Sequence, residues 1–346
     1  MERSSRSRGR TSRLAAEVRI GISGWTYPYW RRVFYPEGLA HRRELEYASR
    51  QFNSVEINGT FYGLQRPDSF ARWHAETPAG FVFAVKGSRF ITHMKKLRDI
   101  EAPLANFFAS GVLKLEHKLG PILWQFPPQW PLDLERFDAF LELLPRTTRA
   151  AARLARRHDE RLADIAWTRT TIDIPVRHAV EPRHPSFFSL PFVRLLRRHN
   201  VALVFADTAD NFPYAEDVTA DFVYLRLHGT GQIYAGGYSS EQLEWWARRI
   251  EAWTCGAEPP DARRIVDRPA RRRGRRDAYV YFDNDAKVRA PFDALELARL
   301  VGLERGCGAD PTEREAPART ARLTAVEIAA RRAETDARWR KRLRTN

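Results

Sequence analysis

The 346-residue sequence has few cysteines, and the two that it has lie far apart. Cys255 and Cys307 both fall in loop-like surroundings. Their spacing indicates neither a disulfide framework nor a thiolate metal site. A chain that uses cysteine in this way suits a reducing compartment, and we expect it in the cytoplasm.

Long apolar runs are also missing from the sequence. No stretch approaches the roughly 20 apolar residues that are needed to cross a bilayer. Residues 1–18 lack the apolar centre of a secretory signal and are rich in arginine and serine instead. We therefore expect no membrane association, and we predict that residues 1–18 form a disordered basic tail.

Acidic residues are fewer than basic ones. The sequence has 43 Asp and Glu against 58 Lys and Arg, which gives a formal net charge of +15. The excess lies in four segments whose net charges are +3 (1–18), +4 (146–169), +7 (263–276) and +4 (304–346). The rest of the chain therefore carries −3. The densest point consists of Arg271, Arg272, Arg273, Arg275 and Arg276. Such a run either binds nucleic-acid phosphates or forms a solvated loop, and the sequence leaves both open.

Short apolar segments alternate with segments of helical periodicity along most of the chain. The sequence predicts strands over residues 19–25, 54–62, 81–86, 121–126, 178–181, 201–207, 222–228 and 278–282. Helices are predicted over 41–52, 66–76, 104–118, 133–145, 191–199, 239–253 and 294–301. This alternation predicts an α/β fold, a single (β/α)₈ TIM-like barrel over residues 19–303. A doubly wound open sheet is the alternative, but no glycine-rich phosphate turn follows the first strand.

Insertions and extensions flank this predicted barrel. We expect insertions at about 146–169, which reads as a helix, and at about 256–276, which is rich in proline and arginine. Residues 304–346 are predicted to be a linker and a basic helical tail, with Thr324 and Glu327 as a helix cap. Few large apolar residues occur there, so we expect an appendage and not a second domain.

Polar residues gather at or near the carboxyl ends of seven of the predicted strands. Within 54–62, a continuous strand would place Glu56, Asn58 and Thr60 on one face. The full set is Glu56, Asn58, Lys86, Gln125, Glu181, Arg183, Asp207, Arg226, His228, Asn284 and Asp285. Strand ends of this kind meet at one face of a barrel, where the sites of this fold lie. The sequence therefore predicts a functional site there.

The residue types at these positions indicate acid–base chemistry and recognition of an anion. Histidines titrate near neutral pH, a carboxylate of raised pKa is a general base, and clustered cations bind carboxylate or phosphate. We predict catalytic roles for Glu56, His93, Glu181 and His228. We predict substrate binding by Asn58, Lys86, Gln125, Arg183, Asp207, Arg226, Asn284 and Asp285.

Other interpretations of the same residues stay open. The carboxylates and cations alternatively form a purely structural ion-pair network. Glu181, Asp207 and His228 alternatively bind a divalent metal, although their spacing carries no metal signature and nearby cations oppose it, so we expect no cofactor. Aromatic residues either stack on a sugar or base or pack beneath the first loop; these are Trp25, Tyr27, Tyr29, Trp30 and Tyr62.

Several motifs resemble the YecE-like family, which is also called domain-of-unknown-function family 72. The motifs occur in order between residue 19 and about residue 303: GISGW (21–25), FYP (34–36), VEINGTFY (55–62), FAVK (83–86) with TH (92–93), LWQFPP (123–128), EPRH (181–184), YLRLHG (224–229) and YFDND (281–285). The resemblance implies a TIM-like barrel but no particular activity. Similarity of that barrel to endonuclease IV and sugar-isomerase barrels suggests nucleic-acid or sugar-phosphate ligands, by analogy of fold. Pro182 and Phe187 depart from the family's usual apolar residue and tryptophan.

Three functions fit these patterns. The first is binding of, or action on, a small anionic or sugar-like ligand at the C-terminal face of the barrel. An enzyme of this kind would use acid–base chemistry of the hydrolase, isomerase or lyase type. The second is nucleic-acid binding or processing through the basic insertions and tail. A non-catalytic adaptor that uses residues 304–346 is a third possibility, and the sequence leaves the oligomeric state open.

Overall fold

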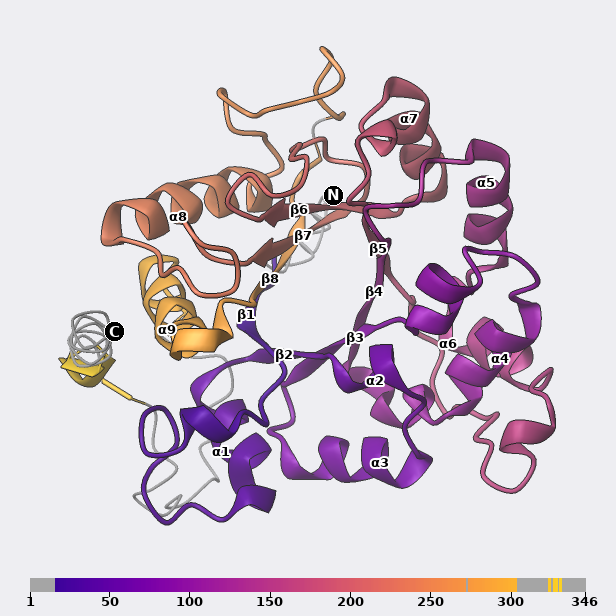
Figure 1. Ribbon diagram of the computed structural model, residues 1–346, viewed down its shortest axis with the longest axis horizontal. Coiled ribbons are helices and arrows are strands. Elements are labelled where there is room, and N and C mark those ends of the chain that lie inside the picture. Colours follow the sequence, from indigo (N-terminus) through magenta and orange to yellow (C-terminus); the bar gives the residue numbers. More distant parts are fainter. Residues whose placement is uncertain (1–15, 272, 304–322, 325, 329, 332–346) are drawn as a thin grey trace, which may run out of the picture.

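The structure is a computed structural model that describes residues 16–271 and 273–303, together with residues 323, 324, 326–328, 330 and 331. In this part of the chain, eight parallel strands form a closed barrel in which each strand pairs with the next and the last pairs with the first (Figure 1). The strands are β1 (Val18–Ser23), β2 (Ser54–Ile57), β3 (Val82–Lys86), β4 (Leu119–Gln125), β5 (His178–Glu181), β6 (Ala202–Asp207), β7 (Phe222–Leu227) and β8 (Asp277–Phe282).

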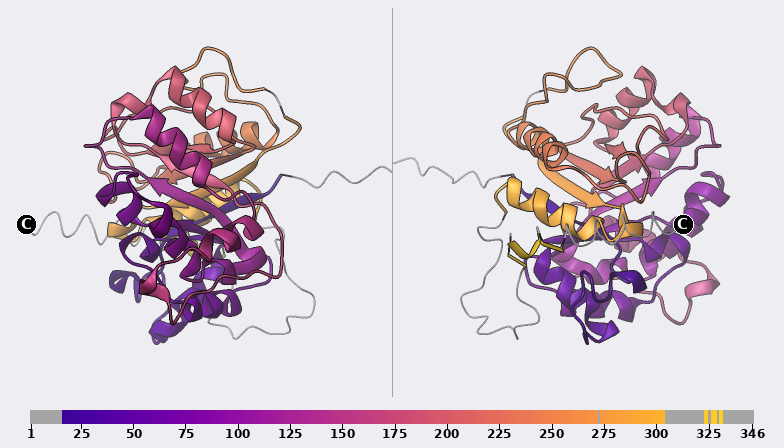
Figure 2. Two further views of the ribbon diagram at one scale, coloured as in Figure 1. Left: turned by 90° about the vertical axis from the view of Figure 1, so that its right-hand side faces the viewer. Right: turned by 60° about the vertical axis from the view of Figure 1, so that its left-hand side comes forward.

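Helices follow the strands and lie outside the ring that the strands form (Figures 1 and 2). They are α1 (Glu44–Gln51), α2 (Gly59–Tyr62), α3 (Pro67–Glu76), α4 (Glu101–Ala109), α5 (Leu134–Leu143), α6 (Thr148–Ala155), α7 (Leu190–His199), α8 (Ser240–Thr254) and α9 (Ala290–Leu300). Helix α8 begins with a capping box, in which Ser239 and Gln242 each accept a hydrogen bond from the backbone of the other. The alternation of strands and helices confirms the predicted (β/α)₈ barrel and excludes a doubly wound open sheet.

The closure of the barrel depends on close contact between its first two strands. Gly21 in β1 lies beside Ser54 in β2. A Cβ atom at residue 21 would lie 1.8 Å from the carbonyl oxygen of Ser54. Because such a contact is impossible without moving backbone, only glycine fits at this point of the β1–β2 pairing.

Two apolar layers result from the alternation of side chains along each strand. Outward-facing residues such as Ile22, Val55 and Phe83 pack with the helices in one large core. Inward-facing residues fill the barrel, with small or medium side chains from β3 to β6 and tyrosines from β7 and β8. The hydroxyl of Tyr281 lies 2.7 Å from Ser54 Oγ inside the barrel. The interior is thus a packed core, as expected for this fold, and space for a ligand is left at its ends.

The segment 54–62 differs from the single strand that its sequence predicts. Strand β2 ends at Ile57, Asn58 has helical backbone angles, and α2 begins at Gly59. Thr60 therefore does not continue the inner face of the strand. Its hydroxyl donates to the carbonyl oxygens of Ile57 at 3.1 Å and Lys86 at 2.6 Å, which joins the start of α2 to the end of β3.

Other boundaries also shift from their predicted positions. Helix α4 ends at Ala109 and is followed by Gly111, whose φ of 115° ends the helix. The predicted helix over 104–118 is therefore α4 and a separate 3₁₀ segment, Val112–Lys118. Helix α9 begins at Ala290, with Pro291 in its first turn, and not at residue 294.

The predicted insertion 256–276 lies at the end of the barrel opposite the strand carboxyl ends. It precedes β8 and extends to the side of the barrel on which β1 begins (Figure 2, left). Helix-to-strand connections lie at the N-terminal face of such barrels. The arginines of this segment are therefore remote from the predicted site. The other predicted insertion, 146–169, precedes β5 and contains α6, which packs on α4 and is capped by Thr147.

The chain termini are described only in part. Residues 1–15 and the predicted linker lie outside the described residues, so the expected disordered tail stays a prediction. Thr324 and Glu327 exchange hydrogen bonds of 2.8 and 3.3 Å in the predicted capping arrangement. Arg331 donates to the carbonyl oxygens of Val33 and Phe34, so this part of the tail lies against the barrel. Within the described residues, no helix combines the length and the apolar character needed to span a membrane.

Candidate functional site

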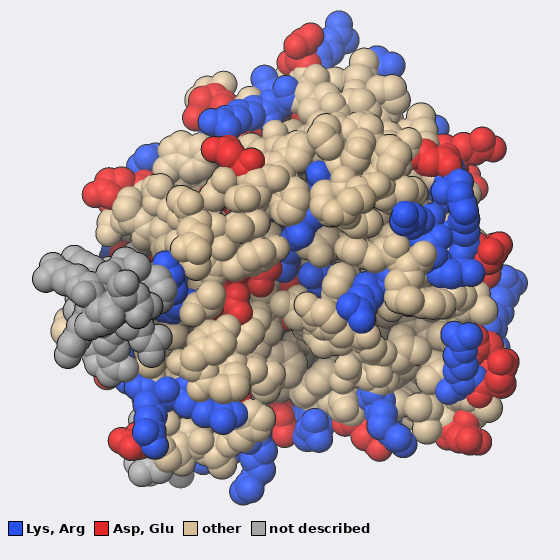
Figure 3. Space-filling model, in the orientation of Figure 1, with Lys and Arg blue, Asp and Glu red and all other residues tan. Residues whose placement is uncertain are grey.

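Polar side chains replace apolar ones inside the barrel at the carboxyl ends of the strands, which we call the mouth. Inward-facing positions are apolar at Ala84, Leu123 and Ala179, and two residues further along they are Lys86, Gln125 and Glu181. Acidic and basic side chains are visible together at the hollowed centre of the face in Figure 3. The structure thus brings much of the predicted set of site residues to one place.

Arg226 lies at the centre of this set and is fully buried. Its guanidinium contacts three carboxylates: Glu56 at 2.9 Å, Glu181 at 2.8 Å and Asp283 at 2.7 Å. Burial opposes the charged form, but these carboxylates outweigh it and raise the pKa of Arg226 above its ordinary value. A permanently charged guanidinium therefore holds three acidic side chains in fixed positions.

Glu56 uses both of its oxygens in this arrangement. It accepts hydrogen bonds from Ser23 Oγ at 2.7 Å and from the Tyr224 hydroxyl at 2.6 Å, in addition to those from Arg226. Ser23 and Tyr224 come from β1 and β7, so Glu56 connects strands on both sides of the barrel. Neither residue belongs to the set predicted from the sequence. Both occupy inward-facing positions of their strands, and the alternation of side chains along each strand could have identified them.

Glu181 is held in a similar way on the other side of Arg226. Its Oε1 accepts from Gln125 Nε2 and from Arg183 Nε, both at 2.9 Å. Burial raises the pKa of Glu181, but the charges of Arg183 and Arg226 lower it more, so the carboxylate stays ionised. The guanidinium of Arg183 also lies 4.5 Å from the centre of the Phe212 ring and contacts the Tyr234 hydroxyl.

His228 and Asp283 form the third side of the arrangement. His228 is fully buried, with Nε2 3.3 Å from Arg226 Nη1 and Nδ1 3.2 Å from Asp283 Oδ2. Burial and the charge of Arg226 lower the pKa of His228, so the neutral ring is favoured. Sequence reasoning missed Asp283 and named Asn284 and Asp285 instead. Tyr279 and Tyr281 face the inside of the barrel. Because side chains alternate along a strand, residue 283 is expected on the same inward face.

Lys86 differs from the other cations of the mouth because no carboxylate of the described residues lies within ion-pair distance of its amino group. Its amino group lies 4.3 Å from the centre of the Phe61 ring, and the residue is buried. Among the described residues, none forms a hydrogen bond or an ion pair with this amino group. Burial and the charge of Arg226 lower the pKa of Lys86 to about 8.

His93 lies beside Lys86 in a short π-helical turn, Phe90–Met94. Its ring packs edge-on against Phe61 with centres 5.1 Å apart, and Nδ1 lies 2.9 Å from Thr92 Oγ1. Burial and the charge of Lys86 lower the pKa of His93 to about 4, so the ring is neutral at pH 7. π-Turns of this kind are frequent at functional sites.

Asp285 adds a carboxyl group in the loop after β8, whereas Lys86 ends β3. Its Oδ2 accepts from the Tyr29 hydroxyl at 2.9 Å, and its carbonyl oxygen accepts from Trp30 Nε1 at 3.2 Å. Burial and the neighbouring charge of Asp283 raise the pKa of Asp285 to about 6. This carboxyl group therefore changes charge close to neutral pH.

Three of the predicted residues point elsewhere. Asn284 is fully buried and donates to Gly236 O and Asp293 Oδ2, both at 2.9 Å, which anchors the loop after β7 and helix α9. Asp207 accepts from the Tyr238 hydroxyl at 3.0 Å, and its side chain forms no ion pair with Arg226. Asn58 lines a neighbouring cleft, and its Oδ1 is buried without a hydrogen-bond partner in the described part of the chain.

This cleft has a volume of about 640 Å³ and lies beside the mouth, between the loop after β1 and helices α1 and α3. Trp25 and Trp73 form one wall, with ring centres 5.4 Å apart in a T-shaped arrangement. Tyr27 and Asn58 also line the cleft. The aromatic residues after β1 thus divide into two groups, because Trp30 is completely buried whereas Trp25 and Tyr27 reach the cleft.

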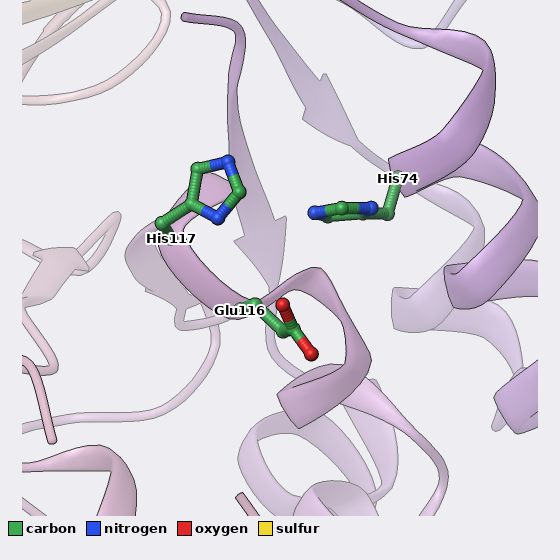
Figure 4. A group of neighbouring side chains, drawn as sticks. All are labelled: His74, Glu116 and His117. Carbon is green, nitrogen blue, oxygen red and sulfur yellow. The ribbon is translucent and has the colours of Figure 1, made fainter. Parts of the chain in front are cut away.

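Metal-ligand geometry occurs away from the mouth. Within the described residues, one set of three histidine or carboxylate side chains has ligand atoms within 4.8 Å of one another, namely His74, Glu116 and His117 (Figure 4). The alternative set of Glu181, Asp207 and His228 is not assembled in this way. The sequence did not point to the first set, because His74 is far from the other two along the chain.

The fold and site define a (β/α)₈ barrel with a buried cluster of ion-paired side chains at its C-terminal mouth. Residues 19–319 match the model of a family described as "Protein of unknown function DUF72", and the chain belongs to this family. The resemblance found in the sequence motifs is thereby confirmed.

Relatives with curated names share parts of this sequence. The UPF0759 protein YecE of Escherichia coli is 32% identical over 129 residues, which are 37% of this chain and 44% of that protein. The UPF0759 protein YunF of Bacillus subtilis is 28% identical over 181 residues, which are 51% of this chain and 54% of that protein. The chain thus spans about half the length of the curated relatives it matches.

Solved structures of the same family share the fold. A DUF72 family protein from Thermotoga maritima has a TM-score of 0.61 and 25% identity, with 82% of this chain and 99% of that chain covered. A DUF72 family protein from Enterococcus faecalis has a TM-score of 0.56 and 17% identity, with 83% and 98% covered. The second likeness concerns the fold alone.

Proposed function

We propose that the barrel binds a small anionic, sugar-like ligand in its mouth, with the anionic group on Lys86. The observation that carries this proposal is the amino group of Lys86, a buried residue, which forms no hydrogen bond or ion pair with any of the described residues. A buried cation without a partner is costly, and an anionic ligand removes that cost. The other cations of the mouth, Arg183 and Arg226, already bind Glu181 and Glu56.

The rest of the mouth suits the polar part of such a ligand. The guanidinium of Arg183 lies near Tyr234 and Phe212, and the neutral ring of His93 lies beside Lys86. Tyr29 and Asp285, which lie beside the end of β8, are suited to bind hydroxyl groups. The fixed cluster around Arg226 forms the floor, and a floor of this kind positions a ligand without reorganising.

If the ligand is a substrate, Asp285 and Lys86 are the pair suited to proton transfer. Their pKa values, about 6 and about 8, lie on either side of neutral pH. An ionised Asp285 accepts a proton while a protonated Lys86 stabilises or protonates developing negative charge. In this proposal Glu56, Glu181 and His228 act by holding Arg226 and the walls of the mouth. Activity is then expected to rise through pH 6 and fall through pH 8.

A thermal-shift screen with phosphosugars and sugar acids tests the binding proposal. We expect one or more of these ligands to raise the Tm of the wild-type protein and of the Lys95→Gln control. Lys95 is only partly buried and pairs with Asp99 at 3.7 Å, outside the cluster around Arg226. The Lys86→Met protein should show no ligand-induced shift from its own baseline. No shift with any ligand, or an equal shift in Lys86→Met, would refute the proposal.

A second candidate function, nucleic-acid binding, is favoured by the loop before β8. Arg263, Arg268, Arg271, Arg273 and Arg275 are exposed there, at the face opposite the mouth. Arg276 does not belong to this exposed group. It is buried and donates to the carbonyl oxygens of Ala257 at 2.9 Å and of Arg271 at 3.1 Å.

Substitution of the exposed arginines separates this function from ligand binding in the mouth. We expect an Arg271→Ser, Arg273→Ser, Arg275→Ser variant to bind nucleic acid more weakly and with a shallower salt dependence than the wild-type protein. Fluorescence anisotropy with a labelled oligonucleotide at several salt concentrations measures both effects. Unchanged affinity and unchanged salt slope would exclude this loop as the binding surface.

A further inference from the structure

Two histidines and a glutamate meet at the end of the barrel opposite the mouth. His74 lies in the last turn of α3, and Glu116 and His117 lie in the 3₁₀ segment directly before β4. Helix α3 packs on this segment. Because β4 begins at Leu119, the group belongs to the N-terminal face and is separate from the proposed ligand site.

The three side chains face a common space (Figure 4). Their ligand atoms lie within 4.8 Å of one another, and the two rings are 5.2 Å apart between centres and nearly perpendicular. Two ligands of one tetrahedral zinc ion with bonds of 2.0–2.2 Å lie about 3.3–3.6 Å apart, so the three side chains would have to move closer together to bind an ion. Such a movement is small enough for side-chain rotation to achieve, without rearrangement of the fold.

Two further observations set this group apart from a chance surface cluster. His74 Nε2 is buried and has no hydrogen-bond partner among the described residues. An unpaired buried nitrogen carries a desolvation cost that a bound ion would remove. Glu116 has φ 47° and ψ −127°, a backbone conformation that non-glycine residues rarely adopt. Strain of this kind persists where the surrounding structure imposes it, and it clusters at ligand sites.

Lys118 carries a positive charge close to the three side chains, and this charge would repel a bound metal ion. Its amino group donates to the carbonyl oxygens of His74 at 2.6 Å and Thr77 at 2.7 Å, and to Thr77 Oγ1 at 3.1 Å. These three bonds use all of its protons, so Lys118 is fixed on the backbone at the end of α3. Its positive charge lowers the affinity for a cation but does not occupy the ligand atoms.

We propose that His74, Glu116 and His117 form a site for a divalent transition-metal ion of the zinc type, with water completing the coordination. Two imidazoles and one carboxylate are a ligand set that Zn²⁺ uses, whereas Mg²⁺ and Ca²⁺ prefer oxygen ligands alone. The bound ion would join α3 to the segment before β4. Since the unfolded chain does not hold these residues together, metal binding would stabilise the fold.

Metal titration of full-length, tag-free, chelator-treated protein tests this site. We expect calorimetry to show one equivalent of bound Zn²⁺, and a saturating concentration of Zn²⁺ to raise Tm by at least about 3 °C. The His74→Ala, His117→Ala double variant should lose both effects. His41→Ala should retain them, because His41 has one carboxylate, that of Glu44, at 3.4 Å and no second histidine in such a group among the described residues. Equal binding and stabilisation in the double variant would overturn the proposal, as would the absence of any Zn²⁺ binding.

A spectroscopic measurement keeps the test independent of the stability of the variants. Co²⁺ bound to the wild-type protein should give visible absorption bands typical of nitrogen and oxygen ligands, and Zn²⁺ should displace it. Glu116→Gln, which keeps the size of the side chain, should weaken Co²⁺ binding at least about tenfold. Thiolate charge-transfer bands would place the ion on Cys255 or Cys307 instead and would refute the site.

Discussion

Arg226 shows at the level of one residue how the mouth is held together. Its guanidinium is completely buried and contacts Glu56, Glu181 and Asp283, so its removal leaves three acidic side chains without their shared partner. Removal of one partner of a buried ion pair destabilises a protein far more than the intact pair stabilises it, because the remaining charge stays desolvated.

The Arg226→Ala protein is therefore expected to lose about 3–5 kcal/mol in free energy of unfolding, or to fail to fold. Denaturant unfolding measures this loss. Arg198→Ala is the matched control, because Arg198 forms an exposed pair with Asp138 and its removal should cost less than about 1 kcal/mol. Similar losses for both variants would contradict the role of Arg226 as the centre of the cluster.

Removal of the Lys86 amino group should stabilise the protein, whereas removal of Arg226 should destabilise it. Its pKa of about 8 in the folded protein lies below the ordinary value of 10.5, so folding disfavours the charged form. At pH 7 we expect Lys86→Met to be more stable than the wild-type protein by about 2–3 kcal/mol. The wild-type protein gains stability as pH rises from 8 to 10.5, so the difference should shrink over that range. A Lys86→Met protein that is less stable at pH 7 would show that Lys86 has a structural partner.

Asp285 provides a second pH-dependent test. Its pKa is raised from 3.8 to about 6, so folding favours the protonated form. The stability that this preference provides is present below pH 3.8 and is lost as pH rises through 6. Relative to Asp285→Asn, the wild-type protein should lose about 2–3 kcal/mol between pH 4 and pH 7, as measured by denaturant unfolding. Parallel pH profiles for the two proteins would indicate an ordinary, solvated carboxyl group.

At the level of elements, the β1–β2 pairing depends on a residue without a side chain. Gly21→Ala would place a methyl group on the carbonyl oxygen of Ser54 and should destabilise the barrel by more than about 3 kcal/mol. Gly80→Ala is the control, since a Cβ at residue 80 meets no atom within 4 Å. Comparing the two variants by thermal unfolding tests the pairing, and an equal, small loss for both would contradict it.

The strands were predictable from the sequence, whereas the short elements between them were not. Apolar runs placed all eight strands, glycine or proline marked the ends of several of them, and β5 has the predicted limits of His178 and Glu181. Helix α2 is only four residues long, so the helical period of 3.6 residues cannot be recognised in its sequence. Gly59–Tyr62 was therefore predicted to be part of a strand. The family motifs identified the fold independently of these boundaries.

The candidate site was predictable in its location and less so in its geometry. Residues at strand ends were expected at the mouth, and Glu56, Glu181 and Arg226 meet there. Asp283 was missed because the strand end was judged by chain position and not by the phase of the inward-facing tyrosines. The sequence also could not show that Lys86 lacks a partner, since this depends on how the carboxylates are shared in three dimensions.

At the scale of the whole molecule, the two ends of the barrel differ in chemistry. The mouth combines Lys86 and the ion-paired cluster around Arg226 with hydroxyl and aromatic groups. The opposite face carries the exposed arginines of segment 256–276 and the group formed by His74, Glu116 and His117. Because these sites lie at opposite ends, substitutions at one should leave the other intact, and each proposal can fail separately.

The crystal structure of the protein with the strongest ligand from the thermal-shift screen is the most direct test of the proposed function. We predict that the ligand lies in the mouth, with its anionic group within hydrogen-bond distance of Lys86 Nζ and its hydroxyl groups towards Tyr29 and Asp285. A ligand bound outside the mouth, or bound there with its anionic group away from Lys86, would contradict the proposal.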